Sequence, residues 1–148
     1  MIPMPAHAPY AHAWGSVGDI MHKVMLALLP ATLFAFWSFG WPAFFLWLTT
    51  VSAAMGWEAL CIWLAGKRIK PKLFDRSAVL TGWLLALSLP PWAPWWTGVT
   101  GSFFAIVLAK QVFGGLGSNP FNPAMVARVA LLISFPVTMT QWVNALPL

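Results

Sequence analysis

A polar, glycine-rich loop is the longest turn-forming interval in the second half of the chain. It reads GGLGSNPFNPA over residues 114–124. Glycine adopts positive φ at little cost, whereas proline fixes φ and removes a backbone donor. Asn122 followed by Pro123 predicts a helix start, with asparagine as the N-cap and proline at the first helical position. We therefore expect a shaped loop that ends one helix and begins another.

Two interpretations of this loop are open. It is a helix connector, or it binds an anion or phosphate at the N-terminus of the helix that follows. The anion signal is weak, because the loop lacks both the lysine and the preceding strand of a nucleotide-binding motif. The candidate loop and interface residues are Lys110, Gly114, Gly115, Gly117, Asn119, Asn122 and Arg128.

Glu58 is the single charged residue in a long apolar block, residues 41–65. An ionisable group inside a membrane segment is by default a functional candidate, which here means a place on an ion path. The alternative is a structural ion pair with a basic residue of the loop at 67–76, since Glu58 lies about two turns from the end of the block. The sequence leaves both interpretations open.

Other reactive side chains form no recognisable site in the sequence. His7, His12 and His22 have no cysteine or acidic companion that would complete a metal site. Cys61 is the single cysteine and lies within an apolar block, which excludes disulfides and iron–sulfur ligation by this chain alone. We predict no catalytic residue and no bound metal.

The composition is that of a membrane protein. Of 148 residues, 60% are hydrophobic and 7% are charged, and the mean hydropathy is +0.77. Soluble domains contain about 25% charged residues. The net charge is +5, but five of the eight basic residues lie in the segment 67–76 between two apolar blocks. This charge sets membrane topology and does not indicate nucleic-acid binding, so the lipid bilayer is the expected surrounding.

The apolar blocks predict an all-α integral membrane fold with about five helices. A surface segment, residues 1–20, precedes a membrane domain over 21–148. The expected helices are broken in places by proline and cover about 21–39, 41–65, 77–94, 96–113 and 123–143.

The third block contains Pro90 and Pro91, so it is either a broken crossing or a re-entrant segment. We expect a crossing, which places the N-terminus and the glycine-rich loop on the cytoplasmic side. Small residues in the fourth block, including Gly98 and Gly101, predict close helix packing.

Several runs of residues resemble one known family. They are SAVLTG at 77–82, LPPWAPWW at 89–96 and AKQVFGGLGSNPFNPAM at 109–125, with shorter runs at 8–12 and 133–140. The chain resembles the family that contains the B subunit of Nqr complexes and the D subunit of Rnf complexes (NqrB/RnfD). Within it, the chain is most similar to the N-terminal half of the D subunit of Rnf-type electron-transport complexes. The resemblance covers nearly the whole chain, and the run at 109–125 is its most specific part.

The resemblance implies the first half of an inverted-repeat, urea-transporter-like subunit of ten helices in the bacterial inner membrane. A subunit of this kind is part of a redox-driven ion pump, a translocase that couples electron transfer between NADH and ferredoxin-type carriers, via flavin, to Na⁺ or H⁺ movement. Its partners are the other membrane and peripheral subunits, and this chain alone is expected to have no catalytic activity. The alternative function is half of a passive small-solute channel of urea-transporter type.

The resemblance also implies FMN, joined covalently to a threonine beyond Leu148, and possible riboflavin or another flavin elsewhere in the complex. Thr138 and Thr140 lack the sequence context of that threonine. No cofactor-binding residue is therefore assigned within this chain.

Overall fold

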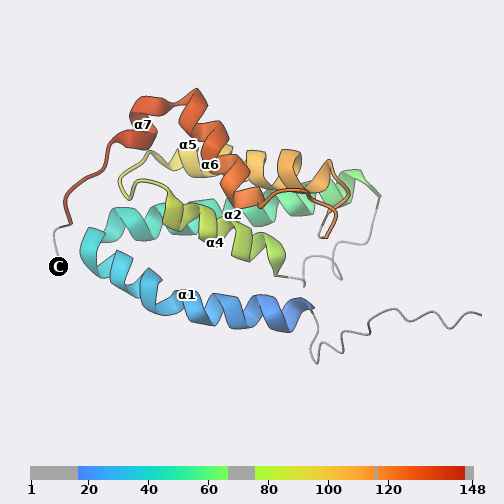
Figure 1. Cartoon of the computed structure of the whole chain (residues 1–148), viewed down its shortest axis with the longest axis horizontal. Helices are drawn as coiled ribbons and strands as arrows, with labels where there is room; N and C mark the ends of the chain where they lie inside the picture. The colour runs from blue at the N-terminus through green and yellow to red at the C-terminus, as the bar shows by residue number, and fades with distance from the viewer. Residues whose placement is uncertain (1–16, 67–75, 116, 146–148) are drawn as a thin grey trace, which may run out of the picture.

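The computed structural model describes residues 17–66, 76–115 and 117–145. Within these ranges every regular element is a helix, which confirms the all-α prediction (Figure 1). The surface segment up to residue 16, with His7 and His12, and the basic loop at 67–75 lie outside the described residues. The elements are α1 (Val17–Phe39), α2 (Trp41–Leu64), α4 (Ser77–Ser88), α5 (Trp95–Phe103), η1 (Phe104–Gln111), α6 (Pro123–Ser134) and α7 (Pro136–Thr140).

The first two helices are long and apolar enough to cross a membrane, over Gly18–Phe39 and Trp41–Leu64. Helix α1 begins at Val17, earlier than the expected start near residue 21, and Asp19 lies in its first turn. An acidic side chain there is favourable because the N-terminal end of a helix is partly positive. The chain reverses at Gly40, whose φ of 69° and ψ of −156° are essentially restricted to glycine.

The third expected helix is shorter than predicted. Helix α4 ends at Ser88 and does not extend to residue 94. Pro90 and Pro91 follow and have no N–H with which to continue the helical bonding. The Ala93 N–H donates to the Pro90 carbonyl at 3.0 Å, which closes a turn before α5 begins.

The fourth expected helix changes its hydrogen bonding partway along. After α5 the chain continues as η1, a π-helix of eight residues. Bonds between residues five apart mark this geometry: the Val112 N–H donates to the Val107 carbonyl at 3.0 Å, and the Gly115 N–H donates to the Lys110 carbonyl at 3.0 Å. The sequence analysis did not predict a π-helix, which is rare and often found at functional sites.

The fifth expected helix, at 123–143, is two helices. Phe135 leaves helical geometry, with a φ of −135° and a ψ of 60°, and separates α6 from α7. Pro136 explains the break, because it lacks an N–H donor and disfavours helical geometry in the residue before it. Helix α7 ends at Thr140, and residues 141–145 are not helical.

The helices run back and forth between two ends of the bundle (Figure 1). Trp41, Trp92 and Asn144 line one pocket at the tryptophan-rich end. Met21, Ser77 and the loop at 119–123 line another pocket at the opposite end. Residues 77–94 thus lead from one end of the bundle to the other.

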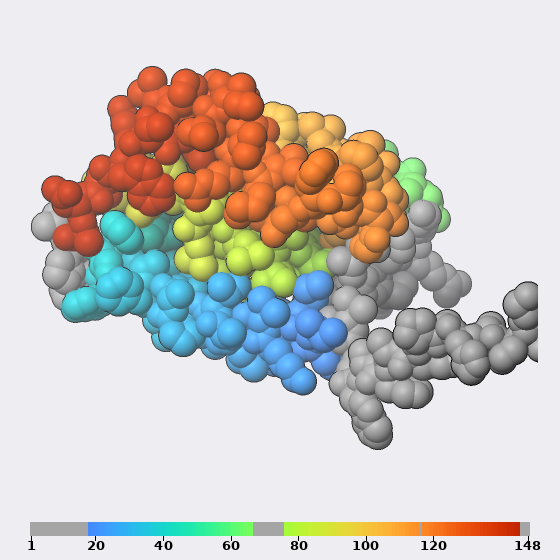
Figure 2. Space-filling view, in the orientation of Figure 1, coloured from blue at the N-terminus to red at the C-terminus, as the bar shows by residue number. Residues whose placement is uncertain are grey.

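Close contacts join the helices around α2, which packs against α1, α4, α5 and η1. A Cβ placed on Gly98 would lie 2.3 Å from Thr50 Oγ1, and one on Gly82 would lie 2.9 Å from Ala54 Cβ. Ser102 Oγ donates to the Thr50 carbonyl at 2.9 Å. These contacts confirm the predicted close packing of small residues. Helix α1 forms one edge of the molecule, and α6 and α7 form the other, with α4 between them (Figure 2).

Candidate functional site

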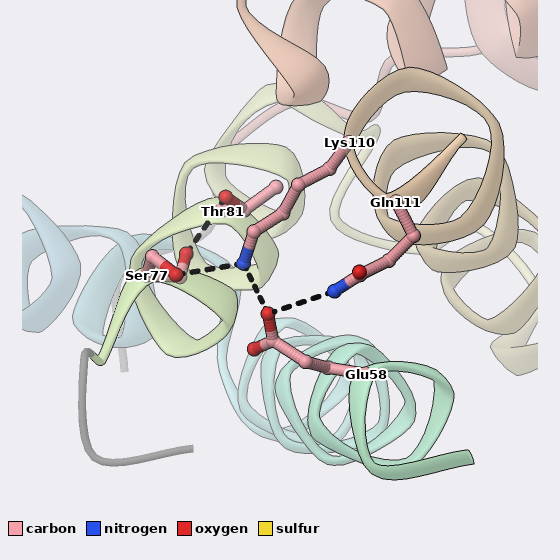
Figure 3. Close-up of polar contacts among 5 residues, drawn as sticks. All are labelled: Glu58, Ser77, Thr81, Lys110 and Gln111. Carbon is pink, nitrogen blue, oxygen red and sulfur yellow. Dashed lines mark hydrogen bonds and ion pairs between the residues drawn. The ribbon is translucent and has the colours of Figure 1, made fainter. Parts of the chain in front are cut away.

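A buried ion pair joins α2 to η1. Glu58 is 4% exposed and Lys110 is 2% exposed. Lys110 Nζ donates to Glu58 Oε1 and to Ser77 Oγ, the latter at 2.7 Å (Figure 3). Within the described residues the charged partner of Glu58 is therefore Lys110, whereas the structural interpretation had expected a residue of the basic loop at 67–76, most of which lies outside the described residues. Three helices meet at this one ammonium group.

Two further polar side chains complete the cluster. Gln111 Nε2 donates to Glu58 Oε1 at 3.3 Å, and Thr81 Oγ1 donates to the Ser77 carbonyl at 2.8 Å. Sequence reasoning missed Ser77, Thr81 and Gln111. One signal was present: Glu58 and Lys110 are lone, opposite charges in separate apolar blocks, and each needs a partner if it is buried.

The π-helix presents neighbouring residues to the same partner. Lys110 and Gln111 are adjacent in η1, and both reach Glu58 (Figure 3). Ala105, Ile106 and Ala109 are buried on the side of η1 that packs into the bundle. The Gly115 N–H binds the Lys110 carbonyl and so ties the glycine-rich loop to the end of η1.

An open pocket of about 410 Å³ lies beside the ion pair. Of the residues predicted from sequence, Lys110, Asn119 and Asn122 line it, whereas Glu58, Gly114, Gly115, Gly117 and Arg128 do not. Ser77 and Thr81 are further polar lining residues, and Met21 of α1 also lines the pocket. The structure thus places Lys110 and the two loop asparagines in the lining of one pocket.

The loop has the backbone that its glycines predict. Gly114, Gly115 and Gly117 have φ values of 105°, 98° and 87°. Asn119 Nδ2 donates to the Phe121 carbonyl at 3.0 Å within the loop. The three positive φ values confirm the expectation of a shaped loop.

The predicted cap of α6 is confirmed, and it argues against an anion site there. Asn122 Oδ1 accepts from the Ala124 N–H at 3.0 Å, and the Asn122 carbonyl accepts from the Met125 and Val126 N–H groups at 3.1 Å each. Because Pro123 has no N–H, these bonds occupy the first-turn donors that an anion would need.

Arg128 does not join the cluster. It is half-buried on α6 and forms no ion pair with any residue in the described ranges. Arg128 was predicted to be a loop or interface residue, but it neither lines the pocket nor pairs with Glu58.

We expect Gly115→Val to reduce the amount of assembled, active complex containing the full-length subunit. A β-branched residue is strained at a φ of 98°, at a cost of about 1–3 kcal/mol. Relief of this strain would release the bond to the Lys110 carbonyl and loosen the end of η1. Native gels and electron-transfer assays on membranes would measure the effect, and unchanged levels of both would contradict it.

The sequence matches the profile of the NQR2, RnfD, RnfE family over residues 4–146. The chain belongs to this family. The match spans the buried ion pair, the pocket and the glycine-rich loop, and it agrees with the resemblance seen in the sequence motifs.

Curated relatives with high identity carry one common name, the D subunit of the ion-translocating oxidoreductase complex. The chain is 58% identical over 133 residues to this protein from Stutzerimonas stutzeri, covering 90% of this chain and 37% of the relative. It is 56% identical over 140 residues to the protein of that name from Rhodobacter capsulatus, covering 95% and 39%. The Halorhodospira halophila protein is 54% identical over 140 residues, with the same coverage. The chain thus spans about two fifths of the length of these relatives.

Proposed function

We propose that this chain forms the N-terminal part of the D subunit of an ion-translocating oxidoreductase complex. In that complex, electron transfer between NADH and ferredoxin-type carriers drives Na⁺ or H⁺ across the membrane. The observation that carries this proposal is the identity of 54–58% with relatives of that name over 90–95% of the chain. The buried Glu58–Lys110 pair is consistent with it, because intramembrane charges commonly mark ion pathways.

The proposed architecture is the first half of a ten-helix inverted repeat, and its partners are the remaining half and the other subunits. Support comes from the length of the relatives and from the alternating direction of the helices in the bundle (Figure 1). We place the complex in the bacterial inner membrane with the N-terminus in the cytoplasm. The basic segment at 67–76 supports this orientation, since positive loops face the cytoplasm.

The passive-channel alternative gains no support. The relatives are named for an oxidoreductase complex, and the pocket beside the loop has a charged, paired lysine in its lining. Buried charges are costly in a membrane segment, and a pore for neutral solutes gives no reason for a lysine there.

Redox-linked ion uptake tests the proposed function. Inverted membrane vesicles would be prepared from cells with the full-length subunit, without it, and with the gene restored. We expect a reduced ferredoxin-type carrier, with NAD⁺ as the electron acceptor, to drive Na⁺ or H⁺ uptake only in the first and third preparations. Equal uptake in all three would exclude a role of the subunit in the pump.

We also propose that the full-length subunit carries covalent FMN, which would supply one-electron and two-electron chemistry to the complex. The described residues of this chain offer no evident attachment site. Thr140 Oγ1 donates to the Pro136 carbonyl at 2.8 Å, and the nearby cavity that Trp142 lines measures only about 70 Å³. No step of electron transfer is therefore assigned to these residues.

Ultraviolet fluorescence of the denatured polypeptide in a gel tests the flavin proposal. We expect a fluorescent band for the full-length gene product and none for residues 1–148 expressed beside it. A dark full-length band would contradict covalent attachment, and a fluorescent short chain would direct attention to Thr138 and Thr140.

A further inference from the structure

Lys110 separates a buried carboxylate from an open pocket. Lys110, Ser77 and Thr81 line the pocket of about 410 Å³, but Glu58 does not. Glu58 lies behind the ammonium group and is 4% exposed. An ion that enters from this pocket and binds Glu58 Oε1 and Ser77 Oγ therefore takes the place that Lys110 Nζ occupies between them (Figure 3).

The atoms around that place suit a small hard cation. Glu58 Oε1 and Ser77 Oγ both accept from Lys110 Nζ. Gln111 lies against the same carboxylate oxygen through Nε2, and rotation of its amide would present its oxygen there instead. Carboxylate, hydroxyl and amide oxygens are the ligands that hard metal cations prefer. They come from α2, α4 and η1, so the set is assembled by the fold.

The ammonium group is an occupant that another cation can replace. It is a compact single charge at the end of a flexible four-carbon stem. The pocket gives this side chain room to move away from Glu58, and Asn119 and Asn122 in its lining have amide oxygens that accept hydrogen bonds. Departure without replacement would leave a buried, uncompensated carboxylate, which is strongly unfavourable. The exchange therefore requires an incoming positive charge.

We propose that Glu58, Ser77 and Gln111 form a binding site for a monovalent metal cation, in which the Lys110 ammonium is the exchangeable occupant. The cation enters from the pocket as Lys110 swings out, and the return of Lys110 expels it. One positive charge replaces another, so the net charge of the buried cluster does not change. This inference rests on the proposed ion-translocating function and assigns the ion a site in this chain.

Sodium-dependent stability of a Lys110→Met variant tests the site without any redox reaction. The solubilised complex with the full-length subunit would be heated in sodium chloride or in choline chloride of equal concentration. Methionine fills a similar volume but leaves Glu58 without a cation. The sodium concentration would be about a hundredfold above the dissociation constant of sodium for the site. Under this condition we expect the temperature at which half of the Lys110→Met complex dissociates to be about 5 °C higher in sodium chloride than in choline chloride.

Three preparations serve as controls. The wild type should respond less than Lys110→Met, because its own ammonium fills the site. Glu58→Gln/Lys110→Met should lose the added sodium response, because the carboxylate is gone. Arg128→Met removes a positive charge from a half-buried position with no ion pair in the described ranges, and it should respond as the wild type does.

The proposal is overturned if Lys110→Met responds to sodium no more than the wild type, which would make the pair a fixed cross-link between helices. It is also overturned if the double variant responds as strongly as Lys110→Met, which would place the sodium elsewhere. A failure of the proposed function would be seen in a different experiment, as an absence of redox-linked ion uptake by wild-type vesicles. The stability measurement would still show whether sodium binds at Glu58.

Discussion

Lys110→Met should destabilise the assembled complex by about 3–5 kcal/mol in sodium-free buffer, because breaking a buried ion pair from one side leaves an uncompensated charge. Glu58 is 4% exposed, and the donor left to it among the described residues would be the amide of Gln111 at 3.3 Å. Methionine nearly conserves the volume of the lysine stem, so lost charge and not lost packing dominates. Thermal dissociation of the purified complex in choline chloride would measure the effect.

Removing the second charge as well should restore much of the lost stability. Glu58→Gln/Lys110→Met has no buried charge to compensate, and replacing both members of a buried pair is often close to neutral. We expect the double variant to be more stable than Lys110→Met alone. A double variant that is as unstable as Lys110→Met would show that the lysine stabilises the bundle through packing.

Gly98→Ala should also have a large effect, although it adds only one methyl group. The new Cβ would lie 2.3 Å from Thr50 Oγ1. Thr50 is fully buried, and its hydroxyl donates to the Leu46 carbonyl at 2.6 Å, so it has little freedom to move aside. Overpacking of this kind costs about 1–3 kcal/mol. Because α5 continues directly into η1, displacement of α5 from α2 would also move Lys110 away from Glu58.

Gly56→Ala is the matched control, since Gly56 is exposed on α2 and a Cβ there would meet nothing within 4 Å. Alanine favours helix over glycine by about 1 kcal/mol, so this variant should be neutral or slightly stabilised. Thr50→Ala should rescue part of the loss in Gly98→Ala by removing the clashing hydroxyl. Dissociation temperatures of the complex would compare the variants. Equal values for Gly98→Ala and Gly56→Ala would contradict the steric explanation.

Local features of the fold were predictable because neighbouring residues determine them. The cap at Asn122, the positive φ values of the loop glycines and the reversal at Gly40 each depend on one residue type and its immediate neighbours. Proline explains two of the corrections to the helix boundaries, since Pro90 and Pro136 stand just beyond the ends of α4 and α6. The sequence analysis expected breaks at proline but kept residues 77–94 and 123–143 as single broken helices.

The ion pair was not predictable to the same degree because it depends on packing between distant residues. Glu58 and Lys110 are 52 residues apart, and their contact depends on the packing of α2 against η1. A regular α-helix assumed from residue 96 to 113 places successive residues about 100° apart around the axis. On that assumption the side chains of Lys110 and Gln111 point in different directions, so a shared partner such as Glu58 is not expected.

The π-helix has a consequence for insertions and deletions in this family. A π-helical turn holds an additional residue compared with an α-helical turn, so loss of one residue within 104–111 could restore regular α-helical bonding. The shortened helix would keep its backbone hydrogen bonds, and the residues beyond it would keep nearly the same direction, because the residue lost is the additional one that the π-helical turn holds. Such a deletion would preserve the membrane helix and would mainly change the directions of side chains within the π-helical segment, which includes Lys110 and Gln111. A single alignment gap in this segment therefore marks relatives in which the polar contacts of η1 with Glu58 are expected to differ while the fold is kept.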